Sequence, residues 1–304
     1  MGGSVHLSLS GFIRGMNSPE QGGDWRVATV QSRFASSIAG NLEKVAVVLK
    51  RLRRSKPDVV LFPECMLTGY RFDFVRLNGE EIRAALRQVA QWAREFDMNL
   101  IVGTPAFRNG RLQNCAVAFD RRGRLVHCYA KCQLTEADRK VFTPGDHIAL
   151  FKLDGVCCST IICHERRYPE LVRLAVMAGA QVLFHPNAGL DSLSVSRSKR
   201  GGRDGIAVRA FENAIYYVFA NSVGPQGGGK WSAGDAKIVA PSGRVLRLAG
   251  NEVEEAITAK IDLSLATRKY AKDSFEEPAF LRDTWKNVVR EVKERANSEG
   301  GLEL

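Results

Sequence analysis

The sequence predicts an α/β protein with a single core. Short apolar runs alternate with stretches in which apolar residues recur every three or four positions, as expected when strands alternate with amphipathic helices. No Pro-, Gly- or Ser-rich linker interrupts this alternation. A composition of 45% hydrophobic and 25% charged residues over 304 positions is ordinary for a globular chain.

The predicted elements follow one another in a regular order. Ile38, Leu42, Val45, Leu49 and Leu52 share one face of the first helix. Further helices are expected at residues 79–97, 169–178 and 204–213. Strands are expected at residues 25–31, 58–62, 100–104, 113–120, 124–130, 156–162, 181–185, 214–221, 236–240, 244–248 and 255–261.

One domain is expected over residues 25–280, after a flexible leader at 1–24 and before a helical extension at 281–304. The apolar residues of the leader are broken by polar ones, and it lacks the basic start and the cleavage site of a signal peptide. In the extension, Trp285 and Val289 belong to an apolar set at helical spacing. We therefore expect it to dock on the body or on a partner subunit.

The cellular setting follows from length and cysteine usage. No segment reaches the length of a membrane span. Seven cysteines, an odd number, fit reduced thiols better than a disulfide framework. The sequence therefore predicts a cytoplasmic protein without a membrane partner.

Cys163 follows the apolar run at 156–162 and precedes Pro169, where a helix is expected to begin. A thiol at a strand end faces a cleft, and amide groups at the start of a helix favour its thiolate form. This pattern indicates a nucleophile. Strand cysteines are more often small buried hydrophobic residues, so the interpretation needs support from elsewhere in the chain.

Glu64 and Lys131 supply that support, because they also stand where apolar strands end. Glu64 follows residues 58–62 through a proline, and Lys131 follows residues 124–130. The carboxyl ends of the strands in an α/β sheet share one edge, where ligands usually bind. Amide hydrolysis needs a nucleophile, a base and a positive charge for the oxyanion, and these three residue types can provide them.

The segments around these residues carry a family resemblance. They are Phe62-Pro63-Glu64 with Thr68-Gly69-Tyr70, Tyr129-Ala130-Lys131 with Phe142-Thr143-Pro144-Gly145-Asp146, and Cys163 with Glu165, Arg167, Tyr168, Pro169 and Glu170. Over about residues 25–262 the chain resembles the nitrilase, or carbon–nitrogen hydrolase, superfamily, in its amidase or N-carbamoyl amino acid amidohydrolase branch. The resemblance implies a four-layer α-β-β-α sandwich that often forms a homodimer or a larger homo-oligomer. One departure is His164, where the family usually has an aromatic residue.

The resemblance also implies a mechanism. Cys163 attacks the substrate carbon, Glu64 takes the thiol proton and later activates water, and Lys131 with the backbone N–H of His164 holds the oxyanion. A thioester intermediate follows. Lys131 should lower the pKa of the thiol and Glu64 should raise it, so the sequence leaves the net direction open.

A second carboxylate is expected four residues before the Phe of the Phe-x-Pro-Gly motif. Counting back from Phe142 gives Asp138, with Glu136 as the nearby rival. We expect Asp138 to orient Lys131 or the substrate. The simpler interpretation is that both are solvated loop charges.

The substrate-binding candidates are Tyr70, His164, Arg166 and Asn187. Arg166 and its neighbour Arg167 resemble the paired arginines that follow the nucleophile in N-carbamoyl-D-amino-acid amidohydrolases, and guanidinium groups suit a carboxylate. Asn187 could donate a hydrogen bond to the substrate, or it could simply cap a turn. The predicted substrate is therefore a small amide or N-carbamoyl compound that carries a carboxylate.

Two other functions stay open at this point. A nitrilase would use the same three residues on a nitrile, and a non-catalytic basic binding protein would keep the fold with idle residues. The net charge of +11 could mark nucleic-acid binding. However, the densest basic segment, residues 194–203, has no aromatic residues for base stacking. We expect a mobile basic loop there and no nucleic-acid partner.

No cofactor and no metal are expected. A metal cluster could be suggested for the group of cysteines that includes Cys128, Cys132 and Cys157. This group lacks the paired C-x-x-C spacing and the downstream pair of histidines of a zinc site. His127, His164 and His185 lie among apolar residues, where a satisfied core or rim histidine is the common outcome. Residues 227–229, three glycines, predict a flexible turn rather than a phosphate loop.

Overall fold

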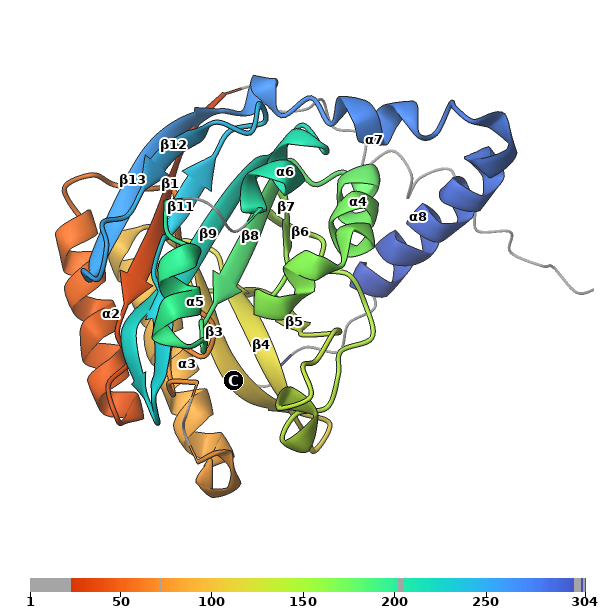
Figure 1. Cartoon of the computed structure of the whole chain (residues 1–304). Coiled ribbons are helices and arrows are strands. Elements are labelled where there is room, and N and C mark those ends of the chain that lie inside the picture. The colour runs from red at the N-terminus through yellow and green to blue at the C-terminus, as the bar shows by residue number, and fades with distance from the viewer. Residues whose placement is uncertain (1–22, 71–72, 202–204, 298–301, 303) are drawn as a thin grey trace, which may run out of the picture.

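The computed structural model describes residues 23–70, 73–201, 205–297, 302 and 304. Two β-sheets lie face to face between helices, with α2 (Ile38–Leu52) and α3 (Gly79–Phe96) on one side and α4 (Pro169–Ala178) on the other (Figure 1). This arrangement is the four-layer α-β-β-α sandwich, so the expected fold is confirmed.

The first sheet combines parallel and antiparallel strands. In spatial order it contains β5 (Leu125–Ala130), β4 (Arg111–Phe119), β3 (Asn99–Arg108), β2 (Val59–Leu61), β1 (Asp24–Ser32) and β13 (Glu255–Asp262). The neighbours β3, β2 and β1 run parallel, whereas the other pairs run antiparallel. The parallel strands end at one edge of the sheet, and Glu64 follows β2 there.

The second sheet is built on the same plan. It contains β6 (Phe151–Leu153), β7 (Val156–Thr160), β8 (Val182–Asn187), β9 (Tyr216–Gly227), β11 (Lys237–Val239) and β12 (Val245–Leu248), and β10 (Lys230–Ala233) pairs with the end of β9. The strands β7, β8 and β9 run parallel. The ends of β1 and β9 join the two sheets, with Gln31 opposite Asn221 and Ser32 opposite Ser222.

Three apolar clusters fill the spaces between the four layers, and successive residues of a strand belong to different clusters. In β2, Val59 and Leu61 face the other sheet, whereas Val60 faces α2 and α3. In β8, Phe184 packs between the sheets and Leu183 packs under α4. Burial of both faces explains why these strands are continuous apolar runs rather than alternating ones.

The remaining helices are shorter or lie at the edge of the molecule. They are α5 (Leu193–Ser198), α6 (Ile206–Phe211), α7 (Lys269–Asp273) and α8 (Arg282–Asn297), and 3₁₀ turns lie at Phe74–Arg76, Asp138–Lys140, Cys163–Arg167, Leu263–Leu265 and Ala279–Leu281. Helices α2 and α3 begin at side-chain caps: the Ser37 oxygen accepts from the Gly40 N–H at 3.1 Å, and the Asn78 oxygen accepts from the Glu80 N–H at 2.8 Å.

Helix α8 packs on α4, so the C-terminal apolar stripe docks on the body of the same chain. Val289 and Val292 are buried in the cluster under α4, and Trp285 packs against it. Of the predicted leader, residues 1–22 lie outside the described residues, and Asp24 already belongs to β1. No helix in the described part of the chain is long and apolar enough to cross a membrane.

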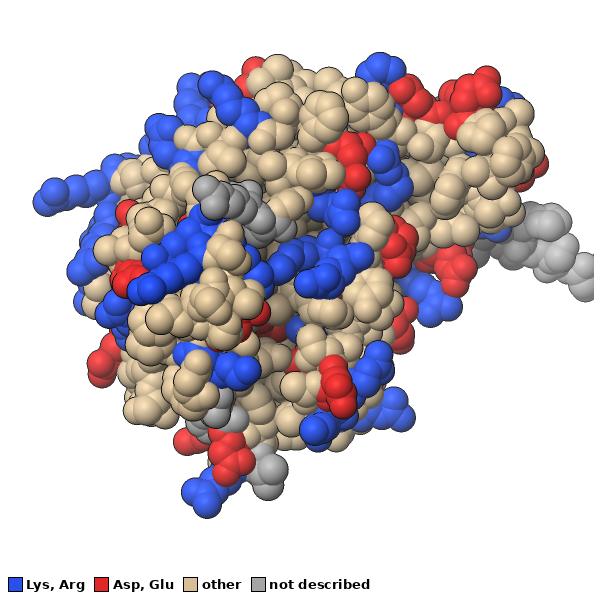
Figure 2. Space-filling model, viewed as in Figure 1, with Lys and Arg blue, Asp and Glu red and all other residues tan. Residues whose placement is uncertain are grey.

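One segment differs from its prediction, and another agrees with it. Residues 194–203 were expected to form a mobile loop, but Ser192 caps α5 there. The Ser196 hydroxyl donates to the Trp231 carbonyl at 3.0 Å, and Lys199 lies 2.5 Å from Asp191. Basic side chains gather across the middle of the face in Figure 2, from the region of α5 toward α4. The turn expected at the three glycines 227–229 is present: Gly227 ends β9, and Gly228 and Gly229 form the turn into β10, a strand that was not predicted.

Candidate active site

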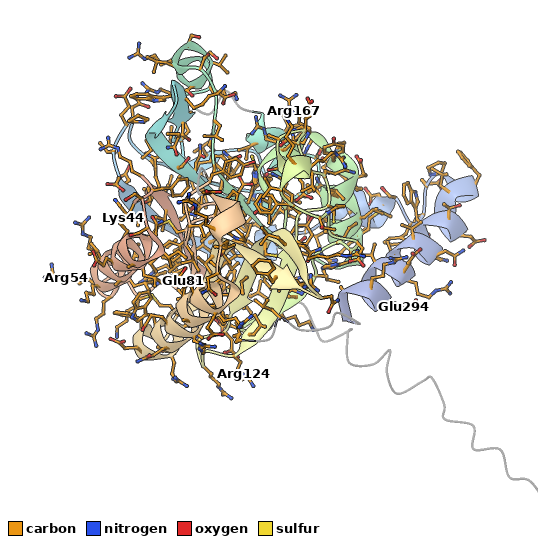
Figure 3. All side chains as sticks on the ribbon, turned by 90° about the horizontal axis from the view of Figure 1, so that it is seen from below. Lys44, Arg54, Glu81, Arg124, Arg167 and Glu294 are labelled. Carbon is orange, nitrogen blue, oxygen red and sulfur yellow. The ribbon has the colours of Figure 1, made fainter. Side chains whose placement is uncertain are left out.

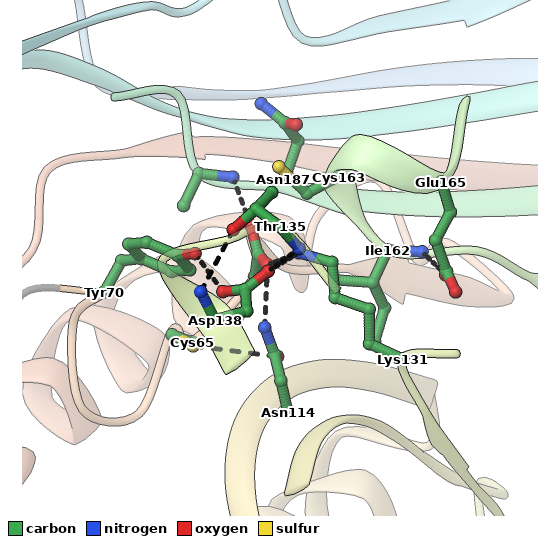
Figure 4. Close-up of polar contacts among 12 residues, drawn as sticks. Cys65, Tyr70, Asn114, Lys131, Thr135, Asp138, Ile162, Cys163, Glu165 and Asn187 are labelled. Atoms are coloured by element: carbon green, nitrogen blue, oxygen red, sulfur yellow. Dashed lines mark hydrogen bonds and ion pairs between the residues drawn. The ribbon is translucent and has the colours of Figure 1, made fainter. Parts of the chain in front are cut away.

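Three strand ends bring Glu64, Lys131 and Cys163 together. Glu64 follows β2, Lys131 follows β5, and Cys163 begins the 3₁₀ turn that follows β7. The Lys131 Nζ lies 3.0 Å from Glu64 Oε1. Figure 4 shows the Cys163 side chain beside this ion pair. The structure therefore brings together the three residues that the sequence singled out.

Glu64 is completely buried, and both of its oxygens accept hydrogen bonds. Oε1 accepts from the Asn114 side chain at 2.8 Å and from Lys131 at 3.0 Å, and Oε2 accepts from the Ala188 N–H at 3.0 Å. Burial raises the pKa of Glu64 although the positive charge of Lys131 opposes it. Asn114 was not predicted as a site residue, because the only hint of such a role in the sequence is a polar amide inside an apolar strand.

Lys131 is held by a second carboxylate, and the structure places Asp138 there rather than Glu136. Asp138 Oδ2 lies 2.9 Å from the Lys131 Nζ, whereas Glu136 is exposed. The Tyr70 hydroxyl donates to Asp138 Oδ1, and the Thr135 N–H donates to Oδ2 at 3.0 Å. Burial by itself would lower the pKa of Lys131. The negative charges of Glu64 and Asp138 outweigh it and raise that pKa well above its usual value, so the ammonium stays charged.

Cys163 sits in a constrained position with a protonated thiol. Its backbone φ is +51°, in the left-handed region that residues other than glycine rarely adopt. Burial and then the negative charge of Glu64 raise the pKa of the thiol to about 12, against the opposing charges of Lys131 and Arg166. The surroundings of Cys163 thus favour the protonated thiol, and a thiol in that form needs a base when it reacts.

Glu165 ties the Lys131 loop to the Cys163 turn. Its Oε1 accepts from the Tyr129 hydroxyl at 2.8 Å and from the N–H groups of Cys132 and Gln133 at 2.7 and 3.0 Å. Its Oε2 accepts from the Ile162 N–H at 2.6 Å. One buried carboxylate thus satisfies donors from the loop after β5 and from the end of β7, which fixes the two segments relative to each other.

Two glycines lie directly behind the reactive residues. A Cβ atom on Gly103 of β3 would come within 2.6 Å of the Glu64 Cα, and one on Gly145 would come within 2.9 Å of the Ala130 carbonyl carbon. The Gly145 N–H also donates to the Lys131 carbonyl at 2.9 Å. Only glycine allows the backbone to approach this closely, which gives a physical reason for the Pro-Gly pair in the loop after β5.

All four predicted substrate-binding residues, Tyr70, His164, Arg166 and Asn187, line a cavity of about 310 Å³ next to Cys163. The Tyr70 hydroxyl is engaged by Asp138, so its ring is the part left for a substrate. The Arg166 guanidinium forms no ion pair with any residue that the structure describes. Arg167 also lines the cavity but projects from the surface (Figure 3).

The Asn187 side chain donates a hydrogen bond to β9 and also presents an acceptor that was not predicted. Its side-chain N–H donates to the Asn221 oxygen at 2.7 Å, and the Asn221 N–H donates to the Gly234 carbonyl at 2.6 Å. The Asn187 oxygen is buried and has no hydrogen-bond partner among the residues that the structure describes. Asn221 takes up one of the two amide hydrogens, so Asn187 can offer the cavity an acceptor as well as its second N–H.

The charges described at the site are those of Glu64, Lys131 and Asp138. Among the described residues, no three His, Cys, Asp or Glu side chains are arranged to hold a metal ion. The seven cysteines, all within the described ranges, are free thiols. Lys131, between two carboxylates, supplies the positive charge of the site.

Comparison with known proteins agrees with this geometry. Residues 26–270 match the model of the carbon–nitrogen hydrolase family. Similar proteins include an (R)-stereoselective amidase from Pseudomonas sp., 29% identical over 71% of this chain and 79% of its own length. A nitrilase from Pyrococcus abyssi is 28% identical over 77% and 87%.

A solved structure of an amidase also has a fold similar to that of this chain. It is a mutant of the amidase from Nesterenkonia sp. AN1 in which the acetamide moiety of fluoroacetamide is added covalently at the active-site cysteine. It matches this chain with a TM-score of 0.73 at 25% identity and covers 86% of this chain and 96% of that one. The chain therefore belongs to the carbon–nitrogen hydrolase family and is a hydrolase.

Proposed function

We propose that this hydrolase cleaves the C–N bond of a small amide or N-carbamoyl compound that carries a carboxylate, through a thioester on Cys163. The observation that carries the proposal is the position of Lys131, which is buried 3.0 Å from Glu64 and 2.9 Å from Asp138 beside that thiol. A buried cation is costly to maintain. It is useful where an amide carbonyl becomes an oxyanion.

The first half of the proposed reaction forms the thioester. The Cys163 sulfur bonds to the carbonyl carbon while Glu64 takes the thiol proton. Lys131 and the His164 N–H hold the negative oxygen that results. The C–N bond then breaks, Glu64 returns the proton to the leaving nitrogen, and an amine or ammonia departs. Glu64 suits both transfers because its carboxyl group lies within hydrogen-bonding reach of the Cys163 thiol.

The second half releases the acid. Glu64 takes a proton from water as the water oxygen bonds to the thioester carbon, and the same two donors hold the oxyanion. The C–S bond breaks, and the Cys163 sulfur recovers its proton from Glu64. Because the pKa of the thiol is raised to about 12, each attack depends on this proton transfer and not on a standing thiolate.

The carboxylate preference is supported by Arg166. Its guanidinium lines the cavity and has no ion-pair partner among the described residues, although its charge acts on Cys163. The buried Asn187 oxygen adds a second requirement, an N–H donor on the substrate. An N-carbamoyl amino acid offers both groups.

The test is a mass-spectrometric screen of amides, N-carbamoyl amino acids and nitriles for turnover and for an acyl adduct on Cys163. Cys163→Ala should abolish both signals in a chain that still folds. Turnover that survives in this variant would contradict the assignment of the nucleophile.

Arg166→Ala tests the carboxylate preference. Loss of a charge-assisted hydrogen bond of about 1.5–3 kcal/mol should raise KM for acidic substrates about ten- to a hundredfold and spare neutral amides. Arg167→Ala is the matched control, because it removes the same charge at an exposed neighbour and should have a smaller effect. An unchanged ratio of acidic to neutral substrates in Arg166→Ala would remove the carboxylate from the proposal.

A nitrile substrate is the second candidate, because one of the similar proteins is named a nitrilase. The same three residues could attack a nitrile carbon. Ammonia release from an amide and a nitrile with the same acyl chain separates the two. Family membership disfavours the third idea, a non-catalytic binding protein.

A further inference from the structure

His185 lies in β8, fully buried beneath the Cys163 turn. Its Nε2 is 3.0 Å from the Cys163 carbonyl oxygen, and its Nδ1 is 2.8 Å from the Tyr217 hydroxyl. A carbonyl oxygen can only accept, so Nε2 carries the hydrogen and donates it. In the neutral ring, Nδ1 then accepts from Tyr217.

The ring is neutral because charge is disfavoured around it. Burial, and then the positive charge of Arg166, place the pKa of His185 well below its usual value, and Lys131 and Lys237 act in the same direction. The hydrogen bond to the Cys163 carbonyl acts in the opposite direction without reversing the result. Tyr217 thus selects one tautomer, and that tautomer aims an N–H at the nucleophile's own backbone.

The contact matters because of what lies on the other side of the same peptide group. The Cys163 carbonyl and the His164 N–H belong to one planar trans peptide, so they point in opposite directions. A hydrogen bond that holds the oxygen therefore also sets the direction of the N–H. It polarises the group as well, which makes that N–H a better donor. The positive φ of Cys163 leaves this peptide in a conformation that needs outside support.

We infer that His185, oriented by Tyr217, is a positioning residue that aims the His164 N–H at the oxyanion of the acyl-transfer transition state. The inference rests on the proposed function of Cys163 as nucleophile. An apolar side chain would fill the space against Phe219, whose ring centroid lies 4.9 Å from that of His185. Packing alone therefore does not explain why this position holds a histidine whose two ring nitrogens both form hydrogen bonds.

Two reactions of the Cys163 thiol distinguish a residue that positions the oxyanion donor from one that only supports the fold. Iodoacetamide alkylates sulfur by displacing iodide and forms no oxyanion. p-Nitrophenyl acetate acylates sulfur through a tetrahedral oxyanion. Loss of one oxyanion donor costs roughly 10²–10³-fold in rate, so a misaimed donor should cost part of that range.

For His185→Leu we expect acylation to slow about ten- to a hundredfold, while alkylation of the Cys163 peptide, followed by mass spectrometry, stays within about threefold. His185→Gln, whose side-chain N–H can meet the same carbonyl, should recover most of the acylation rate. Tyr217→Phe should show a smaller selective loss, and it decides the question if His185→Leu does not fold.

Parallel loss of both reactions in these variants would overturn the inference, because it would show that His185 only supports the fold. Unchanged acylation in His185→Leu would overturn it as well. Cys163→Ala is the separate control for the proposed function. If acylation does not depend on Cys163, the nucleophile assignment fails, whatever the His185 variants do.

Discussion

Glu64 is completely buried, and desolvation raises its pKa although Lys131 lies 3.0 Å away. The negative charge of Asp138 acts in the same direction as burial. A general base must be unprotonated to work, so the position of this pKa sets the acid limit of activity. The residues around Glu64 thus determine the pH range of the enzyme as well as its geometry.

The first prediction concerns this acid limit. Activity should fall as the pH drops through the raised pKa of Glu64, with a midpoint above 4.5, the ordinary value for a glutamate. Asp138→Asn removes a charge that raises the pKa of Glu64, so the midpoint should move to lower pH. The pH profile of kcat/KM measures it.

Glu136→Gln is the control for that measurement, because it makes the same chemical change at an exposed position two residues away. Its profile should match that of the unmodified enzyme. A midpoint that stays in place in Asp138→Asn, or that moves equally in both variants, would mean that the acid limit does not report on Glu64.

At the scale of elements, Glu165 decides whether the Lys131 loop and the Cys163 turn keep their spacing. Glu165→Ala would leave four donors without this acceptor: the buried Tyr129 hydroxyl and Ile162 N–H, and the part-buried N–H groups of Cys132 and Gln133. At about 1–3 kcal/mol for each unsatisfied group, reduced where water can enter, we predict a loss of at least 3 kcal/mol in the free energy of unfolding. Chemical denaturation measures this loss.

Glu170→Ala, in the exposed first turn of α4, is the matched control and should change stability by about 1 kcal/mol or less. Turnover should also fall in Glu165→Ala under conditions where the variant is still folded. A Glu165→Ala enzyme as stable as the control would show that the two strand ends hold their positions without this carboxylate.

The elements show what the sequence could predict. Most strands of both sheets, and the long helices, were predicted because burial on two faces produces apolar runs and burial on one face produces a helical stripe. Strands β6 and β10 and helices α5 and α7 were missed because they are short. Helix α5 and β10 also depend on contacts with each other, such as the hydrogen bond from Ser196 to Trp231.

The residues of the candidate site also divide into those that the sequence could predict and those that it could not. Glu64, Lys131 and Cys163 are recognisable because each follows its own apolar strand, and Asp138 could be counted from a motif. Asn114 reaches Glu64 from another strand, and no local pattern marks it. The acceptor role of Asn187 depends on Asn221, which is 34 residues away in the sequence, so it could only be seen in the folded chain.

At the scale of the whole molecule, helix α8 covers the outer face of α4 with Val289 and Val292. We predict that Val292→Asp lowers the free energy of unfolding by about 3 kcal/mol, because it places a charge in an apolar contact. Asn287→Asp adds the same charge at an exposed position of the same helix and should be nearly neutral. Thermal unfolding compares the two.

Equal melting temperatures for these two variants would show that α8 does not contribute to the stability of the body. Because no residue of α8 lines the Cys163 cavity, turnover at low temperature should survive Val292→Asp. The cytoplasmic location, the homo-oligomeric state and the absence of a nucleic-acid partner stay predictions of the sequence.

The two glycines behind the reactive residues have a practical consequence for changing this enzyme. Gly103 and Gly145 touch the backbone that carries Glu64 and Lys131, so any side chain there would shift a reactive group without removing a single polar atom. A mutant library aimed at new substrates should leave both codons fixed. Its diversity belongs at cavity-lining residues outside the reactive set, such as Leu190 and Ala233, where a change of shape acts on the substrate.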